Sequence, residues 1–263
     1  MNRFGLYATG LFVSVICLTS CLEGGNVSEG WACGVLGYSS KDMNRVLKTG
    51  MADFYSTSLN SAEMFDGDCY LFNYRLDGDS PDNTANVIET RGYYTITISW
   101  IAQLTKYYIT PYVDVSTILP NETPVVKAYF DSEYVDNHWF IYHIVNQSNG
   151  TELKWELSYD ANTMMPTVED DGRRYYDLYL RATVTKEGDN TPKVETQHLN
   201  AYHMSGYLLN AANIEKSLLG SNYSSSSSNF TVRFKYASNI DMENNTITWQ
   251  SDQIDIPIAM FLP

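Results

Sequence analysis

Residues 94–100 read Tyr-Thr-Ile-Thr-Ile-Ser-Trp, and this stretch decides the fold class. Apolar and polar side chains alternate through it, so its four large apolar residues share one face of an extended chain. Aromatic and β-branched side chains fill it, as the half-buried surface of a sheet favours. Comparable runs follow along the rest of the chain, at residues 125–130, 139–145, 153–159, 175–184, 194–204, 230–236 and 254–260.

Short polar turns join these runs, such as 77–79 (Asp-Gly-Asp) and 187–189 (Glu-Gly-Asp). One stretch differs: residues 210–220 begin with Asn, continue with helix formers and end with Gly. That order predicts a short helix near 211–219. Closely spaced strands with almost no helices between them predict an all-β chain built as a barrel or a sandwich.

A change of pattern at residues 116–124 (STILPNETP) suggests a domain boundary. Two prolines stand there, periodicity is weak, and strand patterns lie on both sides. We therefore expect one β domain over residues 31–120 and a second over residues 121–263.

The N-terminus has the plan of a bacterial lipoprotein signal. One basic residue precedes a short apolar run, and small residues lead to Cys21. We expect residues 1–20 to be the signal peptide and Cys21 to carry a covalent lipid, the one prosthetic group expected. The alternative is an ordinary secretory peptide with a chance cysteine. Residues 21–30 are rich in glycine and predict a flexible tether.

Composition excludes two classes of protein. Aromatic residues make up 14% of the 263 residues, which excludes a disordered chain. The formal net charge is −14, whereas a nucleic-acid binder needs a basic surface. We therefore expect no nucleic acid among the partners.

Four sequence windows together resemble the NigD-like lipoproteins of Bacteroidetes. They are 67–74 (GDCYLFNY), 93–106 (YYTITISWIAQLTK), 139–142 (WFIY) and 178–181 (LYLR). The resemblance implies a small N-terminal OB-like barrel followed by a C-terminal β-sandwich. It names no catalytic residue.

The resemblance also bears on where the chain is anchored. In lipoproteins of this kind an acidic cluster after the lipidated cysteine directs export to the outer leaflet, and here only Glu23 lies in that window. We expect a lipid-anchored protein of the outer membrane, on the cell surface rather than on the periplasmic face.

Residues for catalysis or for a transition metal are not arranged in a recognisable pattern. No Gly-x-Ser-x-Gly motif occurs. The four histidines form two pairs, each five positions apart, so the two rings of a pair point to opposite faces of a strand. This argues against a zinc site within either pair and leaves combinations across strands open. The histidines are His138, His143, His198 and His203. We expect neither an enzyme nor a metal protein.

Two further groups keep two interpretations each. The acidic loops 77–82 and 169–171 are solvated turns or, as the alternative, weak calcium sites. Cys33 and Cys69 form a disulfide or remain two buried free thiols.

Tyrosines provide the candidate contact surface, because their rings offer large and rigid contact area for proteins or sugars. Most tyrosines of a β protein are ordinary strand residues, which is the simpler reading. Our first hypothesis is a non-enzymatic accessory protein that binds an outer-membrane partner, for example within a TonB-dependent uptake complex. The second is a surface protein that binds a glycan or peptide and presents it to a transporter. The candidate contact residues are Tyr107, Tyr108, Tyr112, Tyr175, Tyr176 and Tyr179.

Overall fold

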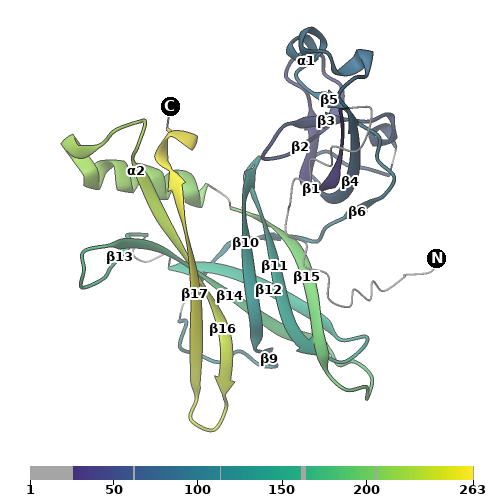
Figure 1. Ribbon diagram of the computed structural model, residues 1–263. Coiled ribbons are helices and arrows are strands. Elements are labelled where there is room, and N and C mark those ends of the chain that lie inside the picture. Colours follow the sequence, from purple (N-terminus) through teal and green to yellow (C-terminus); the bar gives the residue numbers. More distant parts are fainter. Residues whose placement is uncertain (1–25, 62, 113, 161–163, 205, 263) are drawn as a thin grey trace. The chain divides into compact units, whose positions relative to one another are not determined.

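The computed structural model describes residues 26–61, 63–112, 114–160, 164–204 and 206–262 (Figure 1). More than half of these residues lie in strands, and they include two α-helices. The predicted all-β class is therefore confirmed. Neither helix of the described ranges is long and apolar enough to cross a membrane.

The chain divides into two compact units. Among the described residues, unit 1 holds those up to Lys106 together with Glu133–Phe140, and unit 2 holds Tyr107–Ser132 and those from Ile141 onward. This division precedes the boundary expected at residue 120, because the strands just after Lys106 pair with strands of unit 2. Whether residues 31–120 and 121–263 fold separately stays a prediction.

Unit 1 is built on one six-stranded sheet in the order β5-β3-β2-β1-β4-β6. One face of this sheet packs over a core that includes Leu36, Leu47 and Phe72. The elements of unit 1 are β1 (Val27–Tyr38), β2 (Arg45–Lys48), β3 (Asp53–Tyr55), η1 (Thr57–Asn60), β4 (Cys69–Asp77), η2 (Pro81–Asn83), α1 (Ala85–Arg91), β5 (Tyr94–Thr95) and β6 (Ile101–Gln103).

Within the described residues the expected small barrel is an open sheet, with β5 and β6 at its two ends. The ladder breaks inside residues 94–100, where only β5 and a single bridge at Thr97 pair with other strands. The side chain of Asn73 accepts hydrogen bonds from the backbone amides of Ser99 and Trp100, at 3.2 and 2.7 Å. These amides are thereby satisfied without a neighbouring strand, so the sheet does not continue through them.

Of the four residues in the 94–100 stretch that were predicted to share one face, three do so. Tyr94, Ile96 and Ile98 pack on the core of unit 1, as the alternation indicates. Trp100 instead contacts Trp31, because the chain leaves the strand conformation before it.

The first strand begins earlier than the expected tether allows. Residues 27–30 belong to β1 and pair with β4, from Val27 opposite Asp77 to Gly30 opposite Tyr74. Their sequence carries no apolar alternation because this end of β1 is not fully covered on either face. Backbone hydrogen bonds, which leave no trace in the side-chain pattern, hold it in the sheet.

The short helix α1 has no sequence signal strong enough to predict it. None of its seven residues is buried, so it lacks an apolar stripe. It ends at Gly92, whose φ of 81° is left-handed and favours glycine.

Unit 2 contains two sheets, as the sandwich prediction requires. One has the order β10-β11-β15-β7, and the other β17-β16-β14-β12-β8, with β9 and β13 also paired to β14. The strands are β7 (Lys106–Tyr108), β8 (Thr110–Tyr112), β9 (Glu122–Thr123), β10 (Val125–Val135), β11 (His138–Gln147), β12 (Glu152–Asp160), β13 (Thr167–Val168), β14 (Arg174–Lys186), β15 (Val194–His203), β16 (Asn229–Asp241) and β17 (Thr246–Pro257). Six of the seven strand runs predicted after residue 120 are found, and the seventh, 254–260, is a strand only as far as Pro257, because the chain turns into η4 at residues 258–260.

The predicted helix is also found, four residues longer at its start. It is α2 (Tyr207–Leu219), followed by η3 (Gly220–Asn222), and the chain closes with η4 (Ile258–Met260). Tyr207, Leu208, Ala211, Ala212 and Glu215 form its buried side. This i, i+4, i+8 spacing is that of a helix lying on a sheet.

Candidate functional site

Two predicted site residues cannot be placed fully. Cys21 lies outside the described residues, and of Tyr112 only the backbone, in β8, is described. Lipidation of Cys21 therefore stays a prediction.

Tyr107 packs in the interior of unit 2. Its half-buried ring stacks on that of the fully buried Tyr202, with the ring centroids 5.7 Å apart. Burial raises the pKa of the Tyr107 phenol. Its neighbour Tyr108 points outward, with its ring 5.1 Å from that of His203, and remains the exposed member of this predicted cluster.

A buried histidine lies where the two sheets of unit 2 meet. The ring of His143 in β11 stacks on that of Trp155 in β12 at 4.2 Å, and its Nε2 is 3.0 Å from Oη of Tyr202. The pKa of His143 lies well below its usual value, mainly because the ring is buried and secondarily because His198 is close to it. The two histidines come from neighbouring strands, a combination that the sequence left open. The described residues contain no group of three potential metal ligands.

Tyr175 and Tyr179 lie on the outer face of the second sheet, where cations from β16 cover them. Arg233 stands 4.4 Å from the centroid of the Tyr175 ring, and Lys235 Nζ stands 5.1 Å from that of Tyr179. The parallel register places Asp177 opposite Arg233 and Tyr179 opposite Lys235. We call this group the outer ladder. Both tyrosines are buried in it, so they serve as platforms for cations of the same chain.

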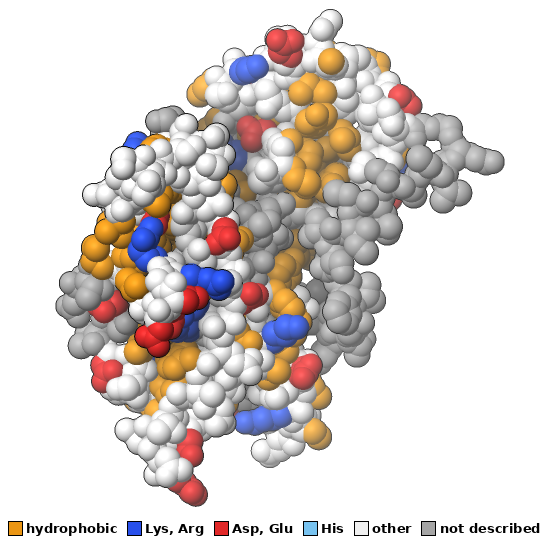
Figure 2. All heavy atoms as spheres, turned by 60° about the vertical axis from the view of Figure 1, so that its left-hand side comes forward, with side chains coloured by type: hydrophobic (Ala, Val, Ile, Leu, Met, Phe, Trp, Pro, Cys, Tyr) orange, Lys and Arg blue, Asp and Glu red, His pale blue; other side chains and the backbone are white. Residues whose placement is uncertain are grey.

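The charges of the outer ladder are fully paired. Asp177 accepts hydrogen bonds from Arg233 Nε and Nη2 at 2.6 and 3.0 Å and from Lys235 Nζ at 2.9 Å. Burial by itself would raise the pKa of Asp177, but these bonds outweigh it and the pKa is lowered. Glu169 binds the remaining Nη1 of Arg233 at 2.5 Å. Figure 2 shows acidic and basic side chains side by side on this unit.

Tyr176 does not belong to the same surface as Tyr175 and Tyr179. Alternation along β14 turns it to the inner face, where its hydroxyl donates to Glu215 of α2 at 3.1 Å. Arg174 Nε also binds Glu215, at 2.9 Å. The three tyrosines predicted as one cluster are thus divided between two faces of the sheet.

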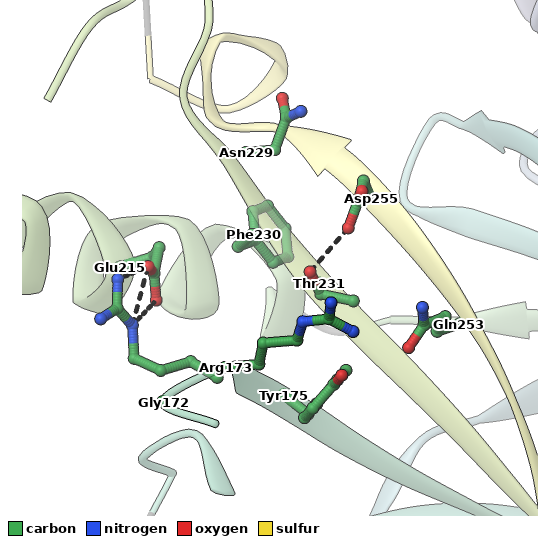
Figure 3. A pocket seen from close by; sticks show the side chains of 10 residues that line it. Gly172, Arg173, Tyr175, Glu215, Asn229, Phe230, Thr231, Gln253 and Asp255 are labelled. Carbon is green, nitrogen blue, oxygen red and sulfur yellow. Dashed lines mark hydrogen bonds and ion pairs between the residues drawn. The ribbon is translucent and has the colours of Figure 1, made fainter. Parts of the chain in front are cut away.

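A hollow of about 510 Å³ opens at the upper end of the outer ladder (Figure 3). Arg173 reaches across it above Tyr175, and Asp255 accepts a hydrogen bond from Thr231 at 2.6 Å on the opposite wall. Gln253 and Asn229 complete its polar rim. We call it the ladder hollow.

The two acidic loops act as ordinary turn and ion-pair partners. Glu169 binds Arg233 and Asp171 binds Arg173 in the second loop. In the first, Asp79 accepts the Asn26 amide and Asp82 binds Arg91. These contacts support the solvated reading, and the calcium alternative has no three-ligand group among the described residues.

Cys33 and Cys69 of unit 1 are both buried, and no disulfide joins them. Cys69 lies opposite Val35 and Cys33 opposite Leu71 in the β1–β4 ladder. Burial raises the pKa of Cys69 to about 12, so the thiol stays protonated.

A second hollow, of about 540 Å³, was not anticipated. It lies where β9 and β10 approach the β16–β17 hairpin, and we call it the edge groove. Its walls carry amides and hydroxyls, from Thr123, Asn146, Ser238, Asn239, Thr248 and Gln250, together with Pro124, Val126 and Lys193.

The edge groove adjoins an open sheet edge. β10 is the terminal strand of its sheet, and its Val126 and Tyr129 are exposed. Lys127 Nζ stands 4.3 Å from the centroid of the Tyr129 ring, and Tyr236 donates to Gln250 at 2.7 Å. Local alternation predicted the strand at 125–130, but only the order of strands in the folded sheet shows that it lies at the end.

The comparisons with known proteins agree with a lipoprotein origin. Residues 24–102 match the family model described as "Lipoprotein OB domain". No curated protein matches the chain.

Solved structures from Bacteroidetes share the fold. An uncharacterised protein from Parabacteroides merdae is 24% identical with a TM-score of 0.70, and the match covers 87% of this chain and 99% of that one. A candidate lipoprotein from Bacteroides fragilis is 14% identical with a TM-score of 0.50, over 86% and 98% of the two chains. A NigD-like immunity protein from Bacteroides caccae is 10% identical over 84% and 91% of the two chains, and its TM-score of 0.43 is too low to establish a common fold. The family model confirms the expected resemblance to lipoproteins with an OB domain, and the first two structures show that the fold of the chain is shared.

Proposed function

We propose that this chain, whose N-terminal unit carries a lipoprotein OB domain, is a non-enzymatic accessory protein that binds an extended segment of another envelope protein. It is anchored in the outer membrane through a lipid on Cys21, faces the cell surface and needs no other cofactor. A TonB-dependent uptake complex is the kind of assembly that such a protein would serve.

The observation that carries this proposal is the edge groove beside the open edge of β10. An extended peptide can add a strand to such an edge, because an edge strand presents backbone N–H and C=O groups that are not paired with a neighbouring strand. Amide side chains of Asn146, Asn239 and Gln250 both donate and accept hydrogen bonds, as a peptide backbone requires.

The paired charges of unit 2 support a binding role over a catalytic one. A carboxylate that acts as a general acid or base must exchange a proton with a substrate, and one that acts as a nucleophile must be free to approach it. In the outer ladder Asp177 is held by two cations, and on the inner face Glu215 is held by Arg174. Such carboxylates stabilise the fold and are poorly placed to react.

Site-specific photo-crosslinking in intact cells tests the proposal. A photoreactive amino acid at Val126, in the edge groove, is expected to capture one envelope protein. The matched control is the same substitution at Val168, an exposed valine on β13. Capture from both positions alike, or from neither, contradicts the proposal.

A glycan or peptide ligand remains the second candidate, and the ladder hollow favours it. Exposed side chains of Arg173, Gln253 and Asp255 there can bind sugar hydroxyls. Retention of the purified protein on a glycan column, lost in Arg173→Ala and kept in Val126→Ala, would favour this ligand over a protein partner.

A further inference from the structure

We infer that the exposed Trp31 of unit 1, together with the half-buried Trp100 that it contacts, rests in the surface of the lipid bilayer to which the chain is anchored. The inference deepens the proposed function and rests on the lipid at Cys21. It assigns a second, non-covalent membrane contact to the folded protein.

The two indole rings contact each other on unit 1. Their ring centroids are 5.1 Å apart with the planes at 65°, and Trp31 is 44% exposed. Asn73, opposite Trp31 in the ladder, holds the amide of Trp100 at 2.7 Å. The pair is thus fixed by the backbone of β1 and β4, although Trp31 contributes little to the core of the unit.

The length of the chain before β1 brings this pair near the membrane. Four residues lie between Cys21 and Asn26, which makes five steps along the chain, and an extended chain spans at most about 3.5 Å per step, or about 18 Å in all. Asn26 is tied to the end of β4: its carbonyl accepts the Gly78 amide at 2.8 Å, and its own amide donates to Asp79 at 3.0 Å. A lipid on Cys21 therefore keeps the start of β1 within about 18 Å of the headgroups.

Trp31 stands close to that start. It is four residues beyond Val27, about 13 Å along the strand at 3.3 Å per residue. Another aromatic residue, Phe65, is 64% exposed and lies in the connection that precedes β4. Two residues later, the Gly67 amide donates to the Leu36 carbonyl at 2.7 Å, which places this connection near the opposite end of β1. The lipid anchor therefore brings the Trp31–Trp100 pair, and not Phe65, close to the bilayer.

The chemistry of the pair suits a bilayer surface. Indole has an apolar body and an N–H that can bind a headgroup, and tryptophan gathers at membrane interfaces for this reason. Beside Trp31, the exposed Arg75 pairs with Glu29 at 3.0 Å and can reach lipid phosphates. An anchor plus a surface contact holds a protein in one orientation, whereas a lipid alone leaves it free to rotate on its tether.

Fluorescence quenching by brominated lipids tests this contact. The lipidated mature protein is reconstituted in phosphatidylethanolamine–phosphatidylglycerol vesicles containing phosphatidylcholine brominated near the glycerol. We expect brominated lipid to quench part of the tryptophan emission. Trp31→Phe with Trp100→Phe should at least halve the quenched part. The matched control, Phe65→Leu, should leave it unchanged.

Each outcome is informative. Equal quenching in the wild-type and double variant overturns the inference, as does photo-crosslinking from position 31 to a protein instead of lipid. Circular dichroism verifies that the double variant is folded, and a folded single variant, Trp31→Phe, replaces it if it is not. A protein that floats with the vesicles but shows no quenching refutes the contact and leaves the anchor standing. A protein that does not float refutes the anchor.

Discussion

The ion pair between Glu122 and Arg181 offers the sharpest test of how unit 2 is held together. Glu122 lies in β9 and Arg181 in β14, and their side chains are 0% and 5% exposed. Arg181 Nε donates to Glu122 Oε1 at 2.6 Å, and its Nη2 donates to the Thr117 carbonyl at 2.5 Å. Glu122 also accepts the Leu119 amide at 2.9 Å. The pair therefore pins the segment before the edge groove to the centre of the sheet.

Glu122→Gln is expected to lower the free energy of unfolding by about 3 kcal/mol. Breaking a buried pair leaves an uncompensated charge, which costs about 3–5 kcal/mol, and the amide retains one acceptor for Arg181. The ratio of folded to unfolded protein should fall by more than about a hundredfold. The double change Glu122→Leu with Arg181→Met should recover most of the loss, because no charge is then left buried.

Urea unfolding at neutral pH, followed by circular dichroism, measures the change. The matched control is Glu152→Gln, which breaks the exposed pair with Lys186, whose side chains are 60% and 65% exposed. That control should cost less than about 0.5 kcal/mol. A loss below about 1 kcal/mol for Glu122→Gln, or equal losses in both variants, would refute the reasoning.

Three further predictions concern the anchor, pH and the thiols. Cys21→Ala should abolish labelling by radioactive palmitate and move the protein out of the membrane fraction; labelling that persists would show that another residue is lipidated. Stability should decrease as the pH falls below about 6.5, because burial keeps the pKa of His143 below that of the unfolded chain, which then binds protons first. His143→Phe should flatten the urea midpoint between pH 7 and pH 5, and an unchanged slope would assign the effect to other groups. Cys33 and Cys69 should react with a thiol reagent only in denaturant, since both are buried; labelling of the native protein at neutral pH would contradict this.

Local sequence patterns predicted most of the long strands of unit 2, the helix α2 and the fold class. These features depend on contacts between residues two to four positions apart, and alternation or helical spacing records them directly. The strand at 175–184 is an example, since its period-two pattern marks β14 within one residue at its start. The expected lipoprotein signal likewise rests on a local pattern, and lipidation of Cys21 stays a prediction.

What covers each face of the sheets depends on tertiary contacts. Alternation shows that Tyr175 and Tyr179 share a face, but the cations that bury them come from β16, more than fifty residues later and in parallel register. The open edge of β10 depends on the order of strands in its sheet. The Trp31–Trp100 contact depends on the interruption of the strand before Trp100, where the side chain of Asn73 accepts a hydrogen bond from the Trp100 backbone amide. Such contacts join segments far apart in the chain, and their pairing is set by the packing of the whole unit. A pattern that repeats every two residues carries no information about which distant segment will lie against it.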